Sequence, residues 1–112
     1  MLPSHGRFLR IATRLGKLQA GSVEADGVIH EVLGRRGTVL PYTTSEEAAR
    51  GLLPAGFEWM APVHSAGTVY MSCRRVGAED RYPYPHHGAW GRTTPLAACG
   101  AAMRAYAKLH SE

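Results

Sequence analysis

Apolar residues recur at helical spacing in two windows near the start of the chain. The first window, residues 7–18, predicts an amphipathic helix with arginines and a lysine on its polar side. Its apolar side consists of Phe8, Ile11, Leu15 and Leu18. The second window, residues 22–33, has Ser22 in position to cap a helix and Gly34 in position to end it. We therefore expect two helices before Gly34.

Two more helices are predicted further along the chain. A short helix is expected over residues 45–53, with Thr44 as its N-cap and Glu47 completing a capping box. The last helix is expected to follow Thr94 as N-cap, because Pro95 then occupies the favoured first helical position. Its small side chains indicate close packing on a sheet or on another helix. These are Ala97, Ala98, Ala101 and Ala102.

Alternation of apolar and polar residues predicts a β-hairpin over residues 57–76, with its turn at 64–67. One face of the second strand carries Val69, Met71 and Cys73, which suit a core. The other face carries Tyr70, Ser72 and Arg74. Because a two-stranded sheet is marginal by itself, we expect either one further short strand or self-association that extends or covers the sheet. A homodimer or higher oligomer is the working assumption.

Residues 77–92 show neither the helical nor the strand period of apolar residues and are predicted to form one long irregular loop. Long loops in compact domains are usually functional or disordered. Side chains that stack and form hydrogen bonds are frequent here, which favours a functional loop. They are Tyr82, Tyr84, His86, His87 and Trp90.

The composition describes an ordinary globular chain. Its 112 residues are 45% hydrophobic and carry a net charge of +4, which suits one domain over 1–112. Within it we expect a basic amphipathic helix in 1–21 and a core over 22–112. The expected fold is α+β, with a small antiparallel sheet packed between helices as an α/β/α-type sandwich. No apolar run is long enough for a membrane span and the start lacks a signal-peptide core, so we expect a cytoplasmic protein.

Residue spacing gives little support for a metal or an active site. Cys73 and Cys99 both lie in apolar patterns, which predicts reduced, buried and inert thiols. His64 and the adjacent pair His86 and His87 lack the spacing of a zinc site. No phosphate-binding glycine loop occurs. We therefore assign no catalytic residue, no metal ligand and no cofactor, and an enzymatic activity is left open.

Hydroxyl, aromatic and cationic residues instead suggest an anion-binding site. The two predicted helix starts offer backbone N–H groups and threonine hydroxyls, which suit phosphate. Aromatic planes and arginine beside them suit a nucleotide, through stacking and charge. The candidate ligand-binding residues are Tyr42, Thr43, Thr44, Tyr70, Arg74, Tyr84, His86, His87, Trp90, Arg92, Thr93 and Thr94. The alternative is that the threonines only cap helices and the aromatics only close the core.

Four segments in order resemble the phage ABA-sandwich domain, a family of small phage and prophage proteins. The segments are 24–34, 41–49, 53–59 and 93–105. The most specific match is the Thr-Pro-Leu-Ala-Ala-Cys run at 94–99, followed by the Tyr-Thr-Thr-Ser run at 42–45. Gly100 and Met103 depart from the family pattern. The resemblance implies a layered α/β/α fold and a phage origin, and it implies no activity.

Three functions are compatible with these observations. The favoured one is a non-enzymatic phage accessory protein that sequesters a nucleotide-type anion in the infected bacterial cytoplasm and so counteracts host defence. The first alternative is an inhibitor that binds a host defence complex such as a CRISPR effector through its basic surface. The second is a small nucleotide or phosphoester hydrolase with a loop histidine as general acid or base.

Overall fold

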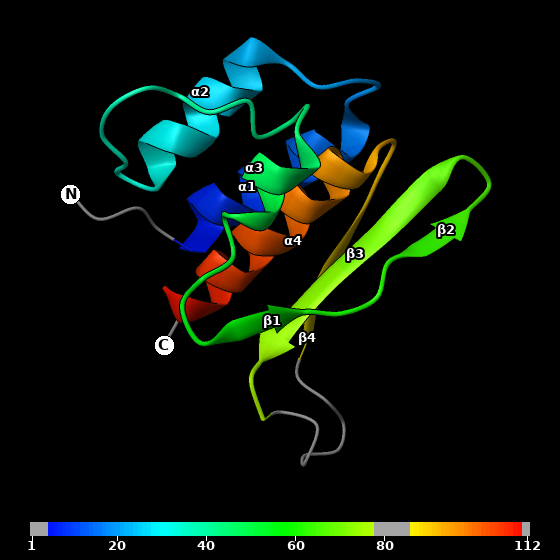
Figure 1. The fold of residues 1–112 in the computed structure, drawn as a ribbon. Helices are drawn as coiled ribbons and strands as arrows, with labels where there is room; N and C mark the ends of the chain where they lie inside the picture. Colours follow the sequence, from blue (N-terminus) through cyan, green and yellow to red (C-terminus); the bar gives the residue numbers. More distant parts are fainter. Residues whose placement is uncertain (1–4, 78–85, 111–112) are drawn as a thin grey trace.

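The computed structural model describes residues 5–77 and 86–110. These residues form four helices and an antiparallel sheet of four strands, which confirms the α+β class (Figure 1). The helices are α1 (His5–Lys17), α2 (Val23–Val32), α3 (Glu46–Arg50) and α4 (Thr94–Leu109). The strands are β1 (Phe57–Trp59), β2 (Val63–Ser65), β3 (Thr68–Arg75) and β4 (His86–Gly91).

Strand β3 is the centre of the sheet. Strands β1 and β2 pair with the two ends of β3, and β4 pairs with it from Arg74 opposite His86 to Val69 opposite Gly91. The predicted hairpin is confirmed, but His64 and Ser65 of the predicted turn belong to β2. The turn consists of Ala66 and Gly67, both with positive φ. Two central residues with positive φ match the twist that a two-residue hairpin needs.

Strand β4 corrects the prediction of one loop over 77–92. Residues 86–91 are a strand, and the expectation of a further short strand is confirmed. The sequence of β4 is rich in glycine and histidine and does not alternate in hydrophobicity, so local pattern gives no strand signal. Its backbone pairs with β3, and its Ala89 and Gly91 pack against α4, which are interactions over long sequence distances.

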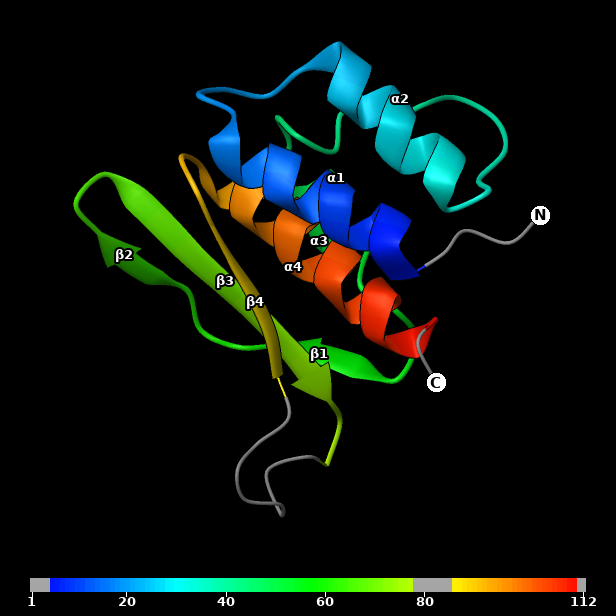
Figure 2. The same cartoon turned by 180° about the vertical axis from the view of Figure 1, so that it is seen from behind.

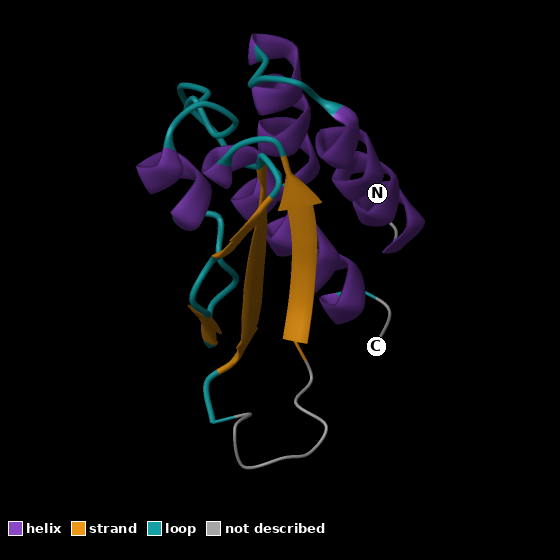
Figure 3. Cartoon of the chain, turned by 90° about the vertical axis from the view of Figure 1, so that its right-hand side faces the viewer, coloured by secondary structure: helices purple, strands orange, loops and turns teal. Residues whose placement is uncertain are grey.

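The helices lie on one side of the sheet in layers. Helix α4 packs on β3 and β4, α1 and α3 pack on α4, and α2 is outermost beside α1 (Figures 1 and 2). In Figure 3 no helix lies in front of the strands, and within the described residues no helix layer covers this second face. The structure therefore differs from the expected α/β/α-type sandwich. Among the described residues, helices cover one face of the sheet and the opposite face is open.

Small residues let α4 approach the sheet closely, as the alanine pattern predicts. A Cβ on Gly91 would lie 2.7 Å from the backbone nitrogen of Ala97, and a Cβ on Gly100 would lie 2.8 Å from the Cβ of Ala89. Larger side chains at either glycine would force the helix and strand apart. Gly100, unusual within an apolar helix, is therefore explained by this contact.

Two helix caps lie one residue away from their predicted positions. Ser45, not Thr44, caps α3 by accepting the N–H of Ala48 at 3.2 Å. Thr93, not Thr94, caps α4 by accepting the N–H of Leu96 at 3.3 Å. In each case two hydroxyl residues are adjacent, and sequence alone does not say which one has the extended backbone of an N-cap. The predicted N-cap Ser22 of α2 is confirmed. The helix ends at Val32 with Leu33 as its C-cap, and Gly34 follows in the predicted left-handed conformation, with a φ of 65°.

None of the helices in the described parts of the chain combines the length and the apolar content that crossing a bilayer requires.

Candidate ligand-binding face of the sheet

The predicted site residues occupy separate places in the structure. Tyr42 and Thr43 lie in the interior, while Thr44 is exposed. Arg92, Thr93 and Thr94 lead into α4, and the hydroxyl of Thr93 is used as its cap. Tyr70, Arg74, His86, His87 and Trp90 lie on the sheet. Tyr84, together with Tyr82, lies outside the described residues.

Tyr42 and Thr43 hold a loop onto the helices. The hydroxyl and the backbone N–H of Thr43 both lie 2.7 Å from Oδ1 of the buried Asp26, and the hydroxyl accepts the N–H of Ser22 at 2.8 Å. The Tyr42 carbonyl accepts the thiol of Cys99 at 3.2 Å. Thr43 is 1% exposed, so a ligand reaches it only if this network opens. The structure thus gives both residues a role in packing, and it adds Asp26, which sequence analysis missed.

The open face of the sheet carries an exposed aromatic pair. Tyr70 and Trp90 are opposite each other on β3 and β4, with ring centroids 5.1 Å apart and planes at 50°. Trp90 is 48% exposed, an unusual fraction for so large an apolar side chain. Tyr70, Ser72 and Arg74 lie on this face as predicted, opposite Trp90, Gly88 and His86 of β4, while Val69, Met71 and Cys73 are buried against the helices. Ser72 is nevertheless only 5% exposed, so the face is accessible at the aromatic pair and not at this hydroxyl.

Charged groups flank this pair at one end of the face. Nε of Arg74 lies 3.3 Å from Oε2 of Glu58 on β1, and His86 is opposite Arg74 on β4. This ion pair holds the guanidinium at the sheet surface, four residues along β3 from Tyr70. The face therefore combines stacking surface with a positioned cation and a carboxylate.

Gly88 is the residue of this face that sequence analysis missed. It lies between His86 and Trp90 on β4, and a Cβ there would collide with the Tyr70 ring. A glycine inside a strand often marks such a close approach. This inference from glycine is possible only once residues 86–91 are known to form a strand.

The two adjacent histidines point to opposite sides of β4. His86 is opposite Arg74 of the open face, whereas His87 is opposite Cys73 and its ring lies 6.1 Å from that of Phe57. Both nevertheless reach a groove at the free edge of β4. Among the described residues no three histidine, cysteine or acidic side chains gather closely enough to hold a metal ion.

The two cysteines are buried and not joined by a disulfide, as predicted. Burial raises the pKa of Cys73 to about 12, and burial together with the nearby Asp26 raises the pKa of Cys99 to about 12. A thiol must ionise to act as a nucleophile. At neutral pH both residues are therefore core residues with no nucleophilic role.

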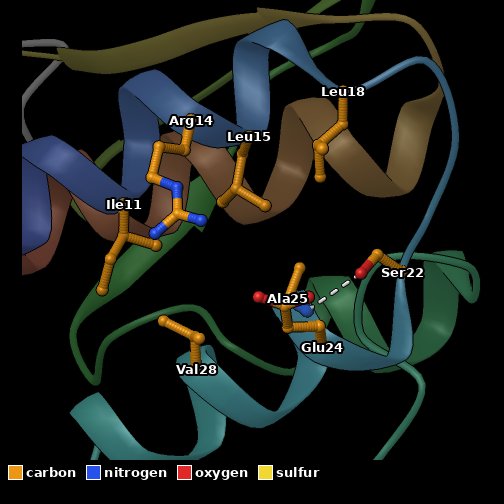
Figure 4. Close-up of a pocket in the computed structure, with 8 residues that line it drawn as sticks. All are labelled: Ile11, Arg14, Leu15, Leu18, Ser22, Glu24, Ala25 and Val28. Carbon is orange, nitrogen blue, oxygen red and sulfur yellow. Dashed lines mark hydrogen bonds between the residues drawn. The ribbon is translucent and has the colours of Figure 1, made fainter.

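A small cavity of about 110 Å³ separates α1 from α2 (Figure 4). Its wall is mostly apolar, with Leu15, Leu18 and Val28 among the lining residues, and the Arg14 guanidinium extends into the gap between the helices. The hydroxyl of Ser22 at the other side is used as the cap of α2. None of the predicted ligand-binding residues lines this cavity.

No family model, curated protein or solved structure matches this chain. The resemblance to the phage ABA-sandwich domain therefore stays a hypothesis.

Proposed function

We propose that the open face of the sheet binds a nucleotide-type ligand by stacking its base on Tyr70 and Trp90. The carrying observation is the exposed Tyr70–Trp90 pair at 5.1 Å on a sheet face that no described helix covers. Aromatic side chains on an open antiparallel sheet are a known way to stack bases, and each stacked base contributes about 1–3 kcal/mol.

The charge of the protein supports an anionic ligand. Arg74 is held at the sheet surface by Glu58, and Arg92 is exposed two residues beyond Trp90. The net charge of the whole chain is +4. A positive field raises the encounter rate with phosphate-bearing ligands, and guanidinium groups bind phosphate through paired hydrogen bonds. The face therefore suits a ligand with both an aromatic base and a phosphate.

In this proposal the protein sequesters its ligand and leaves it unchanged. The inert Cys73 and Cys99 and the stacking geometry support binding over turnover. The biological role that fits is that of a phage accessory protein that withdraws a nucleotide signal of host defence. That role rests on the resemblance of the sequence to small phage proteins, and homo-oligomerisation stays part of the hypothesis.

Binding of a host protein is the second candidate. One observation favours it: Val63, opposite Tyr70 on β2, is 52% exposed, so the aromatic pair has an apolar neighbour. Exposed apolar patches often mark protein interfaces. A stable complex with a host protein, formed by a chain that binds no nucleotide, would favour this candidate.

The test is thermal stabilisation against linear nucleotides, cyclic mononucleotides and dinucleotides, nucleotide sugars and short single-stranded oligonucleotides. A ligand at a hundredfold excess over its Kd stabilises the folded state by about 2.7 kcal/mol. We expect stabilisation by at least one member and recovery of that compound intact after heating. No stabilisation across the panel contradicts nucleotide binding, and recovery of a product contradicts sequestration.

A further inference from the structure

A second feature, separate from the aromatic pair, is a groove of about 340 Å³ at the free edge of β4. It lies between the start of β4, the first turns of α1 and the last turns of α4. Five basic side chains line it: His5, His86, His87, Arg104 and Lys108. Among the described residues that line it, none is acidic. We refer to it as the basic groove.

The fold brings these five residues together from three distant parts of the sequence. Arg104 and Lys108 are one helical turn apart on the exposed side of α4. His86 and His87 begin β4, and His5 begins α1. Helix α1 runs beside α4, which places its first turn next to the last turns of α4 (Figure 2). The basic groove is therefore a product of tertiary structure that local sequence does not reveal.

The imidazole of His5 is held in one orientation. Its Nδ1 lies 3.1 Å from the carbonyl oxygen of Ala107. Because a carbonyl only accepts hydrogen bonds, Nδ1 carries the proton and donates it. His5 would therefore contact a ligand through its second ring nitrogen, Nε2. Protonated, it donates a hydrogen bond to an anion.

Arg104 and Lys108 both line the groove and can donate charge-assisted hydrogen bonds to an oxyanion bound in it. Arginine offers a planar fork and lysine a point charge, which are the two groups that proteins use for phosphate.

We infer that the basic groove is a binding site for a phosphate-class oxyanion, held by Arg104 and Lys108 with the histidines as further donors. The site goes beyond the proposed stacking function. Its cationic side chains are not part of the aromatic pair, and His86 and Gly88 lie near both sites. Either site can therefore fail without the other. The ligand class is a phosphoryl group, whether of a free phosphate ester or of a nucleotide.

The experiment is calorimetric titration of the full chain with inorganic pyrophosphate, which has no base to stack. The test variant is the double substitution Arg104→Gln with Lys108→Gln, both at exposed helical positions. The matched control is Arg36→Gln with Lys17→Gln, which removes the same charge from exposed positions outside the groove. The test variant loses two charge-assisted hydrogen-bond donors, so we expect it to bind pyrophosphate about tenfold more weakly or worse.

Three results would overturn the proposal. They are no binding of pyrophosphate by the wild-type chain, equal weakening in test and control variants, and unchanged binding in the test variant. His5→Ala adds a further check, because it removes a donor from α1 and should also weaken binding. Trp90→Ala should leave pyrophosphate binding unchanged, so that failure of this site and failure of base stacking are seen separately.

Discussion

The ring of Tyr70 on β3 lies over Gly88 on β4, so that a Cβ at position 88 would collide with Cζ and the hydroxyl of the tyrosine. The same ring faces Trp90 at 5.1 Å. Because Gly88 has no side chain, the Tyr70 ring can pack against the β4 backbone beside Trp90. The position of the aromatic pair, on which the proposed function depends, is set by the absence of a side chain at position 88.

Gly88→Ala should therefore weaken nucleotide binding with little change in stability. The added methyl meets the far end of a side chain on an open face, so the ring can move at low cost, but it leaves its place beside Trp90. Binding and the urea midpoint would be measured together. Gly27→Ala is the control, since a Cβ there meets nothing within 4 Å. Unchanged affinity in Gly88→Ala would mean that the position of Tyr70 does not matter.

Trp90→Ala should reduce the affinity for a nucleotide by about 5- to 150-fold. That range corresponds to the loss of about 1–3 kcal/mol of stacking on one base. Trp90→Phe keeps an aromatic plane and should restore part of the affinity. Val23→Ala, which shortens an 87% exposed side chain on α2, is the control and should bind normally. Equal affinities in wild type and Trp90→Ala would exclude this face as the site.

Two glycine-to-alanine substitutions should change stability in opposite directions. Gly27 lies inside α2 with open space around it, so alanine should stabilise the protein by about 0.5–1 kcal/mol. At Gly100 in α4 the new methyl would meet Ala89 at 2.8 Å, and overpacking costs about 1–3 kcal/mol. Chemical denaturation of both variants tests the close contact of α4 with β4. A stabilised Gly100→Ala variant would contradict that contact.

Thr43→Val should destabilise the protein and leave ligand affinity unchanged. The substitution removes the hydroxyl that accepts the N–H of Ser22 and contacts Asp26, so buried polar groups lose their partner. The expected loss is about 1–3 kcal/mol in the free energy of unfolding, measured with urea. Weaker nucleotide binding by a fully folded variant would instead place Thr43 at the ligand.

The two cysteines predict a pH dependence of stability. Thiols ionise near their ordinary pKa of 9.0 in the unfolded chain but at a pKa of about 12 in the folded chain. Between those values the folded state binds more protons, so the free energy of unfolding falls as pH rises from about 9 to about 12. Cys73→Ala with Cys99→Ala, compared over the same pH range, should show a shallower fall. The native wild type should also resist thiol reagents at about pH 8.

Much of the fold follows from local sequence. The apolar stripes of α1 and α2, the N-cap Ser22 and the proline at the start of α4 are short-range signals, and all identify elements of the structure. The alternation of Val69, Met71 and Cys73 with polar and aromatic residues likewise predicts which face of β3 packs against the helices. It does not predict that Ser72 on the other face is buried as well. These signals work because side chains three or four residues apart on a helix, or two apart on a strand, share one face.

The site is harder to predict from the sequence because it depends on pairing between distant segments. Strand β4 has no alternating pattern of apolar and polar residues, and its pairing with β3 is not evident from local sequence. Without that pairing, Trp90 is assigned to a loop, the need for glycine at position 88 is not apparent, and nothing indicates that His5 lies near Arg104. The burial of Thr43 could not be predicted either, because its partner Asp26 occupies what the sequence pattern indicates is a polar position on a helix surface.

The most direct test of base stacking uses the two tryptophans of the chain as reporter and internal control. The indole N–H of Trp59 donates to the carbonyl oxygen of Arg50 at 3.1 Å, on the helix-covered side of the sheet, whereas Trp90 lies on the open face. An NMR titration of the ¹⁵N-labelled protein with the stabilising nucleotide resolves both indole signals. We predict that the Trp90 signal shifts and saturates while the Trp59 signal stays in place. A stationary Trp90 signal under saturating ligand would contradict stacking on this face.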